Sequence, residues 1–348
     1  MSVTRYHRQT LLPAVGNAGQ ARFAKAHVLL VGCGALGGVV AEQLVRAGVG
    51  HLRIVDRDIV ELSNLQRQVL FDERDATEGL PKAAAAANRL RQINSQVELD
   101  AIVADLTAQN IERFAGLEQG GTPVDLIVDA VDNADTRYLI NDLSVKTQIP
   151  WVYGACVGTE GRVMAIRPPH TACLRCLFPD PPAPGELPTC DTTGVLGPMA
   201  GVIASLQAAA ALEILLGREP APGMLVANLW PTRFRTLDAP ASLRGTCNVC
   251  TGGKFEFLHG ENSRRSTTLC GRNAIQVKPS DVSGIDLSFL ASRLQGVGLI
   301  ERTAHLLRCR LTDPDDVQLT VFPDGRAIIH GVTSPDRANA IYARYIGN

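Results

Sequence analysis

The sequence has no excess of either charge and no long uninterrupted apolar run. Among 348 residues, 34 Lys and Arg are balanced by 35 Asp and Glu, which gives a formal net charge of −1. Without a basic field or a Lys/Arg-rich block, the composition argues against a nucleic-acid partner and against a membrane surface. No segment reaches the roughly 18 consecutive apolar residues that a membrane span needs. We therefore expect no nucleic-acid partner and no membrane partner.

A signal peptide and a disulfide framework are also missing from the pattern. The first residues, MSVTRYHRQTLLP, lack the apolar core of a signal peptide, so we expect a cytoplasmic protein. In a reducing compartment, the nine cysteines point to metal-binding or catalytic thiols rather than to disulfides. Hydrophobic residues make up 45% of the chain, which is enough for the core of one large domain plus a smaller one.

Strands and helices alternate along most of the sequence. Residues 28–31 (VLLV), 51–56 and 124–132 predict buried strands, with helix-forming segments between them. This alternation predicts an α/β domain with a mostly parallel, Rossmann-like doubly wound sheet and helices on both faces. From about residue 255 the pattern changes to a small α+β module. We place the first domain at 1–253 and the module at 255–348.

A glycine motif follows the first predicted strand. Gly32, Gly34 and Gly37 form G-x-G-x-x-G, in which glycines allow a tight turn and let helix N–H groups approach phosphate. Asp56 ends the next strand, where its carboxylate could accept hydrogen bonds from ribose hydroxyls. The motif predicts a bound nucleotide but does not separate NAD from ATP.

The segment after the second strand, residues 56–71, favours ATP. It places Asp58, Asn64, Gln66 and Arg67 close together, and the guanidinium fork of Arg67 suits phosphate. Polar residues at this position are unusual for a dinucleotide enzyme, which usually continues directly into a helix.

Two further positions fit a phosphate site. Lys82 begins a helix, where a cation gains nothing from the helix dipole and makes sense beside an anion; a solvated surface lysine is the alternative. Asp132 and Asn133 follow a buried strand at the sheet edge where ligands bind, and Asp132 could hold Mg²⁺. Cations and an acid around a nucleotide indicate chemistry at phosphorus rather than hydride transfer.

The cysteines fall into two groups. CLRC and CNVC are C-x-x-C pairs, and two such pairs predict a closed structural zinc site of four thiolates, whereas a single pair could be redox-active. The expected ligands are Cys173, Cys176, Cys247 and Cys250. Cys190 has no such partner; it is either an inert core residue or a reactive thiol.

Eight motifs carry a family resemblance. In order they are RYHRQ (5–9), GCGALGG (32–38), DRDIVELSNLQRQ (56–68), GLPKA (79–83), DAVDN (129–133), CLRC (173–176), CDTTGVLGP (190–198) and CNVC (247–250). Together they resemble the ThiF/MoeB/HesA family, bacterial relatives of ubiquitin-activating enzymes, over roughly residues 1–253. The resemblance implies a homodimer that uses MgATP to adenylate the C-terminal glycine of a small ubiquitin-like sulfur carrier with a Gly-Gly tail.

The resemblance also implies roles for individual residues. Asp132 would bind Mg²⁺, Arg8 would reach the ATP of the other subunit, and Cys190 would bond to the activated carrier or take part in sulfur transfer. Catalysis would rest on Arg8, Arg67, Lys82, Asp132 and Cys190. The implied nucleotide contacts are Gly32, Gly34, Ala35, Gly37, Asp56, Asp58, Ser63, Asn64, Gln66, Arg67, Lys82, Asp132 and Asn133.

Several alternatives stay open. CDTTGVLGP favours the ThiS-type carrier of thiazole biosynthesis over the MoaD-type carrier of molybdopterin synthase. Because residues 255–348 lack a rhodanese-like loop, a separate protein would donate the sulfur. An NAD-dependent oxidoreductase would leave Arg67, Lys82 and the cysteine pairs unexplained, and a non-catalytic zinc-stapled scaffold predicts no pyrophosphate exchange. Near-neutral charge and the zinc cage disfavour activation of a tRNA base.

Overall fold

A computed structural model describes residues 5–182, 190–260, 266–269, 274–277, 284–312 and 316–347. The chain divides into two compact units, residues 1–262 and 263–348. The first unit extends past residue 253, where the sequence analysis ended it, because the side chains of Phe257 and Leu258 are buried in its core.

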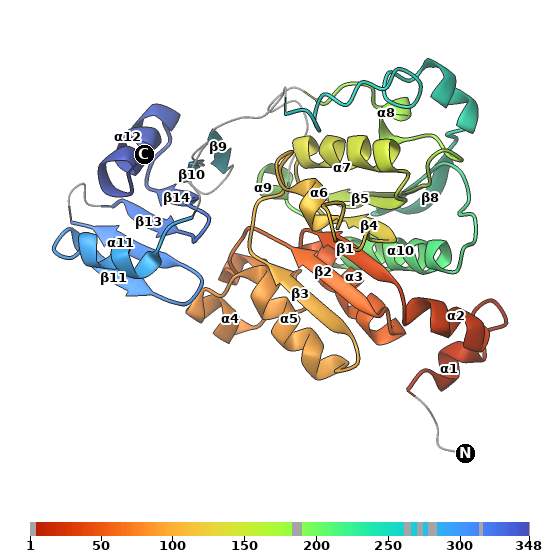
Figure 1. The fold of residues 1–348 in the computed structure, drawn as a ribbon, viewed down its shortest axis with the longest axis horizontal. Helices are drawn as coiled ribbons and strands as arrows, with labels where there is room; N and C mark the ends of the chain where they lie inside the picture. The colour runs from red at the N-terminus through yellow and green to blue at the C-terminus, as the bar shows by residue number, and fades with distance from the viewer. Residues whose placement is uncertain are drawn as a thin grey trace. The chain divides into compact units, whose positions relative to one another are not determined.

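An eight-stranded sheet forms the centre of the first unit, in the order β3-β2-β1-β4-β5-β6-β7-β8 (Figure 1). The first five strands in this order pair in parallel, and the last three are added antiparallel. The mostly parallel α/β fold is thereby confirmed, while the hairpin of β7 and β8 was not predicted. The strands are β1 His27–Val31, β2 His51–Val55, β3 Glu98–Ile102, β4 Leu126–Asp129, β5 Trp151–Val157, β6 Glu160–Ile166, β7 Met224–Leu229 and β8 Thr232–Leu237.

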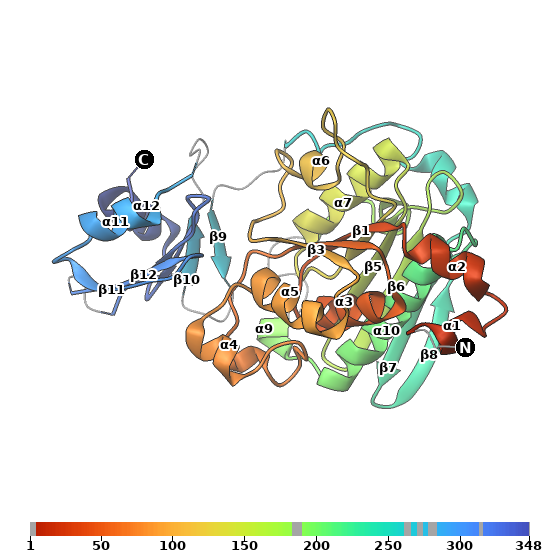
Figure 2. The ribbon, with the colours of Figure 1, turned by 60° about the horizontal axis from the view of Figure 1, so that its bottom comes forward.

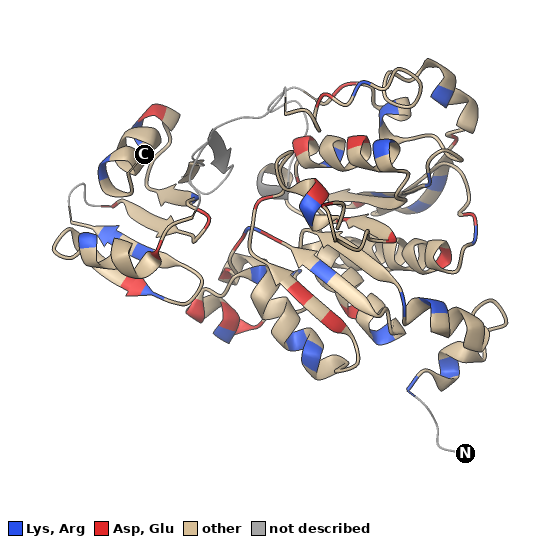
Figure 3. Ribbon diagram, in the orientation of Figure 1, with Lys and Arg blue, Asp and Glu red and all other residues tan. Residues whose placement is uncertain are grey.

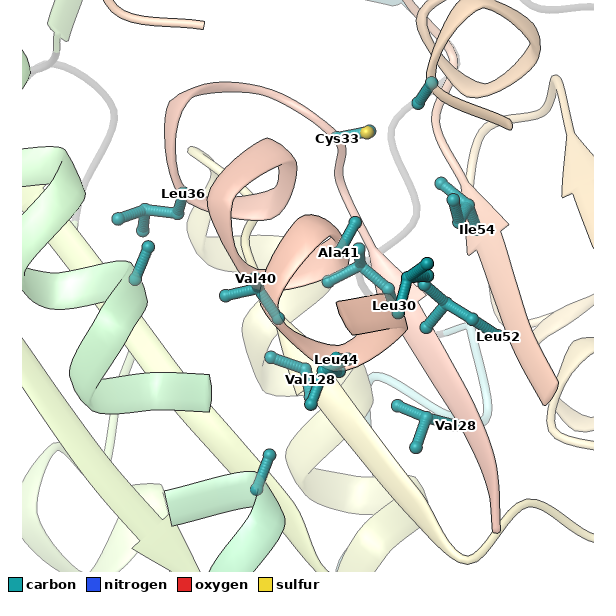
Figure 4. Packing of buried hydrophobic residues seen from close by; sticks show 14 of the residues in the cluster. Val28, Leu30, Cys33, Leu36, Val40, Ala41, Leu44, Leu52, Ile54 and Val128 are labelled. Carbon is teal, nitrogen blue, oxygen red and sulfur yellow. The ribbon is translucent and has the colours of Figure 1, made fainter. Parts of the chain in front are cut away.

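Helices cover both faces of this sheet (Figures 1 and 2). One face carries α3 Ala35–Ala47, α5 Lys82–Ile93 and α10 Gly197–Leu215, and the other carries α6 Ile111–Phe114 and α7 Ala134–Thr147. Strand β1 shows why: Val28 and Leu30 point into the first core, and Leu29 and Val31 into the second. Figure 4 shows side chains of α3 and of three parallel strands gathered in the first core.

Short helices complete the first unit. They are α1 His7–Thr10, α2 Gly16–Phe23, η1 Leu62–Asn64, α4 Glu73–Glu78, α8 Leu174–Leu177, α9 Cys190–Thr193 and η2 Ala241–Thr246. In both units, Lys and Arg positions are interspersed with Asp and Glu positions (Figure 3).

Among the described residues, one helix, α10, is long and apolar enough to meet the length and composition of a membrane span. Its contacts show that it is a core helix of this unit, because Met199, Ile203 and Ala204 are buried against the sheet and α3. Its fully buried Gln207 donates a hydrogen bond to the Asp129 carbonyl at the end of β4.

The second unit is an α+β module, as expected. Its antiparallel sheet has the order β11-β12-β13-β14-β10-β9, and α11 Leu287–Arg293 and α12 Pro335–Tyr345 pack on one face. The predicted hairpin turn at Asp324 and Gly325 joins β13 to β14. The strands are β9 Ser266–Leu269, β10 Ala274–Val277, β11 Gly298–Arg302, β12 Leu307–Leu311, β13 Gln318–Val321 and β14 Ala327–His330.

Candidate active site and metal centre

The glycine loop connects β1 to α3 with a geometry that only glycine permits at two positions. Gly32 has φ +86°, and a Cβ there would lie 2.6 Å from the carbonyl oxygen of Ala130. A Cβ on Gly37 would collide with the carbonyl oxygen of Gly32. Gly34 is the N-cap of α3 and Ala35 its first residue, so the N–H groups at the start of this helix are available to an anion.

Asp56 joins this loop to the segment after β2. Its Oδ2 accepts the backbone N–H of Cys33 at 2.6 Å, and its Oδ1 accepts that of Asp58 at 2.7 Å. Burial raises the pKa of Asp56, and the nearby Lys82 ammonium opposes that shift. The Asp56 carboxylate therefore contacts the glycine loop, and its role towards a ribose stays a prediction.

Lys82 is buried, with 3% of its surface exposed, so the alternative of a solvated surface lysine is wrong. It is the first residue of α5, its Nζ lies 3.1 Å from Asp58 Oδ2, and its N–H donates to the Asp58 carbonyl. A buried ammonium is stable only with anionic or acceptor partners, and a phosphate would supply further ones.

The segment from Ser63 to Gln68 lies beside the glycine loop, because a Cβ on Gly34 would be 3.6 Å from Gln68 Nε2. Asn64 is buried, and its Oδ1 accepts the N–H of Glu61 at 3.1 Å. The Arg67 guanidinium donates to the Ser63 carbonyl at 2.9 Å. Ser63 and Gln66 are exposed.

Arg57 lies at the edge of the sheet formed by the carboxyl ends of the parallel strands, and it was not predicted as a site residue. Its Nη1 lies 3.3 Å from Asp105 Oδ1 and its Nε 3.8 Å from Asp58 Oδ1. Burial alone would lower the pKa of Arg57, but the carboxylates of Asp105, Asp58 and Asp132 raise it, so the guanidinium stays charged. The order Lys82–Asp58–Arg57–Asp105 makes a chain of alternating charges along the carboxyl ends of β2 and β3.

Asp132 and Asn133 follow β4 at the same edge. The Asp132 side chain is exposed, so its carboxylate oxygens are available to the oxygen-preferring Mg²⁺ ion, and the donor chemistry fits. The Asn133 side chain instead caps α7, since its Oδ1 accepts the N–H of Thr136 at 2.9 Å. Asn133 therefore sets the start of the helix that follows Asp132.

The four paired cysteines converge as predicted. Their sulfur atoms lie within 4.8 Å of one another, and the separations are 3.8 Å for Cys173–Cys247 and 3.7 Å for both Cys173–Cys176 and Cys176–Cys250. A tetrahedral zinc ion with Zn–S bonds of about 2.3 Å has sulfur–sulfur edges of about 3.8 Å. These three separations therefore match a tetrahedral Zn²⁺ site.

The four-cysteine cluster is connected to α7 through Arg175, which lies between Cys173 and Cys176 in the sequence. Its guanidinium lies 3.1 Å from Glu256 and 3.8 Å from the buried Asp142, and it donates to the Pro179 carbonyl at 2.9 Å. The Asp142 Oδ2 accepts the N–H of Phe257 at 3.0 Å, and burial raises the pKa of Asp142 to about 6.

Cys190 begins α9, and its side chain lies outside the described residues, as do residues 183–189 before it. The residues after α9 lie at the carboxyl end of β5, because Gly158 N–H donates to Gly194 and Leu196 N–H donates to Gly158, each at 2.8 Å. Strand β5 neighbours β4, after which Asp132 follows. Helix α9, which begins with Cys190, therefore lies at the same edge of the sheet as the glycine loop.

Arg8 is not part of this edge. Tyr6, next to α1, contacts the C-cap Gly48 of α3, and its hydroxyl accepts a hydrogen bond from the C-cap Asn94 of α5 at 2.9 Å. The glycine loop and Lys82 lie at the N-terminal ends of α3 and α5. A 13-residue helix such as α3 is about 20 Å long, so about 20 Å separate the glycine loop from the end that Tyr6 contacts. An arginine side chain cannot span that distance, so Arg8 does not reach the site of its own chain.

Comparisons with known proteins agree with this geometry. Residues 6–249 match the ThiF family. The sequence is 42% identical over 344 residues, 99% of both chains, to the sulfur carrier protein ThiS adenylyltransferase of Bacillus subtilis. It is 43% identical over 253 residues to the sulfur carrier protein adenylyltransferase of Thermus thermophilus, covering 71% of this chain and 90% of that one.

Two further comparisons each cover 72% of this chain. The adenylyltransferase and sulfurtransferase MOCS3 of Anopheles gambiae is 41% identical over 251 residues, 72% of this chain and 55% of that one. The crystal structure of Escherichia coli MccB with AMPCPP and MccA matches with a TM-score of 0.63 at 20% identity, covering 72% of this chain and 74% of that one. The structural match shows a shared fold.

Proposed function

This chain belongs to the ThiF family and is an adenylyltransferase, and from that premise we propose that it uses MgATP to adenylate the C-terminal glycine of a ThiS-type sulfur carrier. The proposed products are the carrier acyl-adenylate and pyrophosphate. The MoaD-type carrier is the second candidate, and a separate protein would donate the sulfur.

One observation carries the choice of carrier. Similarity to the protein named for ThiS extends over 99% of both chains, so it includes the second unit, residues 263–348. The similarity to the Thermus protein and to MOCS3 covers 71% and 72% of this chain. A unit shared with the ThiS-named relative favours the ThiS-type carrier.

The reaction needs no proton transfer. A carboxylate oxygen of the carrier attacks the α-phosphorus, an O–P bond forms, and the bond from the α-phosphorus to the bridging oxygen breaks. Pyrophosphate leaves with the electron pair. Since the carrier carboxylate is already ionised at neutral pH, the site requires no general base. Its task is to position the two reactants and to stabilise negative charge on the phosphates.

The residues of the edge divide this task. We assign the α3 N-terminus, Lys82 and Arg67 to the phosphates and Asp56 to the ribose. Asp132 would hold Mg²⁺, which supplies charge neutralisation on phosphate oxygens when bound. The four-cysteine centre would hold a structural Zn²⁺. Cys190, which begins a helix at this edge, remains a proposed acceptor of the activated carrier tail.

We place the last cation, Arg8, in the ATP site of a partner subunit, which makes the homodimer part of the catalytic unit. Because Arg8 lies far from the site of its own chain, it can act only in trans. The two residues after α1, Leu11 and Leu12, are 59% and 55% exposed, which is a high exposure for leucine and suits a helix that packs on another molecule.

Mixing two inactive variants tests the trans arrangement. Arg8→Ala should lower pyrophosphate exchange about 100-fold, as loss of one charge-stabilising donor does. Mixing it with Asp132→Ala should restore about a quarter of the wild-type rate, because half of the randomly formed dimers would be hybrids with one intact site. Exchange of subunits is verified by native mass spectrometry, and hybrid dimers without activity would show that Arg8 does not act in trans.

The carrier assignment is tested by ATP–pyrophosphate exchange with purified ThiS-type and MoaD-type carriers side by side. We expect the ThiS-type carrier to have the larger kcat/KM, by at least about tenfold, which corresponds to about 1.4 kcal/mol. Carriers that lack the terminal glycine serve as controls and should give no exchange. Faster exchange with the MoaD-type carrier would reverse the assignment.

A further inference from the structure

Strands β4 and β5 separate just before the proposed Mg²⁺ ligand. Their parallel pairing comprises Ile127 with Trp151 and Val128 with Val152. Beyond these pairs β5 continues its pairing with β6, while β4 stays paired with β1 as far as Asp129. The backbone carbonyls that face the opening gap need other donors, because an unpaired buried carbonyl is costly.

From one face of the sheet, Gln207 of α10 enters this gap. The side chain is fully buried, and its Nε2 donates to the Asp129 carbonyl at 2.7 Å and towards the Val152 carbonyl at 3.4 Å. A Cβ at Gly154 would collide with the Gln207 amide, so the glycine in β5 makes room for it. One amide thus bridges the ends of the two separated strands.

From the other face, Arg137 of α7 makes the corresponding bridge. Its Nη2 donates to the Val131 carbonyl at 2.6 Å and to the Gly154 carbonyl at 3.3 Å, and the guanidinium lies 5.2 Å from the centre of the Tyr153 ring. Its Nε lies 3.5 Å from Asp129 Oδ2. Asp129 Oδ1 in turn accepts the N–H of Val131 at 3.0 Å.

Val131 is therefore held on both sides of its α-carbon, at its N–H by Asp129 and at its carbonyl by Arg137. The Val131 carbonyl belongs to the peptide whose nitrogen is that of Asp132. Asp129 is fully buried, so it does not meet substrate. Burial raises the pKa of Asp129 to about 6 against the opposing effect of Arg137, which leaves the carboxylate ionised at neutral pH.

We propose that Arg137, Asp129 and Gln207 form a positioning clamp that fixes the Val131–Asp132 peptide, so that the Asp132 carboxylate is presented to the Mg²⁺ of bound MgATP. The clamp rests on the proposed function, because it acts through Asp132. These three are positioning residues, which act through the backbone of Val131 and Asp132. Outer partners of this kind typically change metal affinity about 10- to 100-fold when replaced.

The test compares the affinity for ATP with and without Mg²⁺, measured by calorimetry on the full chain. Arg137→Lys keeps the positive charge beside Asp129 but loses the fork that reaches Val131 and Gly154. Asp129→Asn keeps an acceptor for the Val131 N–H but removes the anion that holds Arg137. In both variants we expect the gain in ATP affinity from Mg²⁺ to fall at least about tenfold, with ATP affinity in EDTA unchanged.

Asp142→Asn is the matched control. Like Asp129, Asp142 is fully buried, accepts a backbone N–H and faces a buried arginine, but it lies beside the cysteine cluster. Its replacement should lower thermal stability as Asp129→Asn does and leave the Mg²⁺ effect unchanged. The clamp is overturned if a folded Arg137→Lys or Asp129→Asn keeps the wild-type Mg²⁺ effect, or if Asp142→Asn loses as much.

Asp132→Asn separates failure of the clamp from failure of the proposed function. If Asp132→Asn keeps the Mg²⁺ effect, the Mg²⁺ assignment itself is wrong, and the clamp falls with it. If Asp132→Asn loses the effect while both clamp variants keep it, only the clamp is wrong. If Arg137→Lys does not fold, Asp129→Asn alone decides between these outcomes.

Discussion

Asp132→Asn is expected to lower carrier-dependent ATP–pyrophosphate exchange by at least about 1,000-fold while the protein stays folded. The Asp132 carboxylate is exposed at the carboxyl end of β4. Its replacement therefore removes a proposed Mg²⁺ ligand without changing the packing of the core. Exposed substitutions of this kind usually change stability by no more than about 0.5 kcal/mol. Exchange is measured with labelled pyrophosphate and a saturating carrier, and folding by the unchanged melting temperature.

Asp135→Asn provides the matched control for this prediction. Asp135 is also an exposed aspartate, and it lies three residues further along in the first turn of α7. It should keep nearly all activity, since its loss costs only a favourable helix-dipole interaction of about 0.3–1 kcal/mol. Near-normal exchange by Asp132→Asn, or an equal loss in Asp135→Asn, would remove Asp132 from the centre of the mechanism.

The residues that could be predicted from sequence are those whose spacing is tied to backbone geometry. Gly32 and Gly37 are required by a positive φ and a close helix approach, and both constraints leave a visible glycine pattern. The two C-x-x-C pairs are visible for the same reason, because each pair forms one short turn around half of the metal. Lys82 was identified from its place at a helix start, and the structure adds that it is buried.

The features that were not predicted from the sequence have no such local pattern. All six side chains of β8 are exposed, so the strand shows no alternation between buried and exposed positions, and neither it nor its partner β7 was predicted. In the sequence, Arg137 looks like an ordinary exposed arginine of a helix. Its hydrogen bonds depend on the separation of β4 from β5, which no local sequence pattern predicts. Gln207 interrupts a mostly apolar helix, as Ser205 and Glu213 also do, so the sequence does not single it out.

Loss of the metal from the four-cysteine centre is the second large effect that we expect. Cys250→Ser should lower the zinc content from one ion per chain to near zero and destabilise the first unit by at least about 4–5 kcal/mol, the range seen when a structural metal is lost. The centre joins residues 173–176 to residues 247–250, and Cys173 and Cys247 are buried in the second core. A metal held there would therefore link residues 247–250 to residues 173–176 and to the second core.

Cys190→Ser is the control, because four other cysteines converge and a closed tetrahedral zinc site takes four thiolates. It should bind zinc and melt as the wild type does, whatever it does to sulfur transfer. Zinc is measured by atomic emission and stability by denaturant unfolding of the reduced protein. Hydrogen bonds with the neighbouring thiols, followed by burial, raise the pKa of Cys173 and Cys250 to about 12, so these two thiols stay protonated at neutral pH without a cation beside them. A Cys250→Ser protein with full zinc and wild-type stability would contradict a structural four-thiolate site.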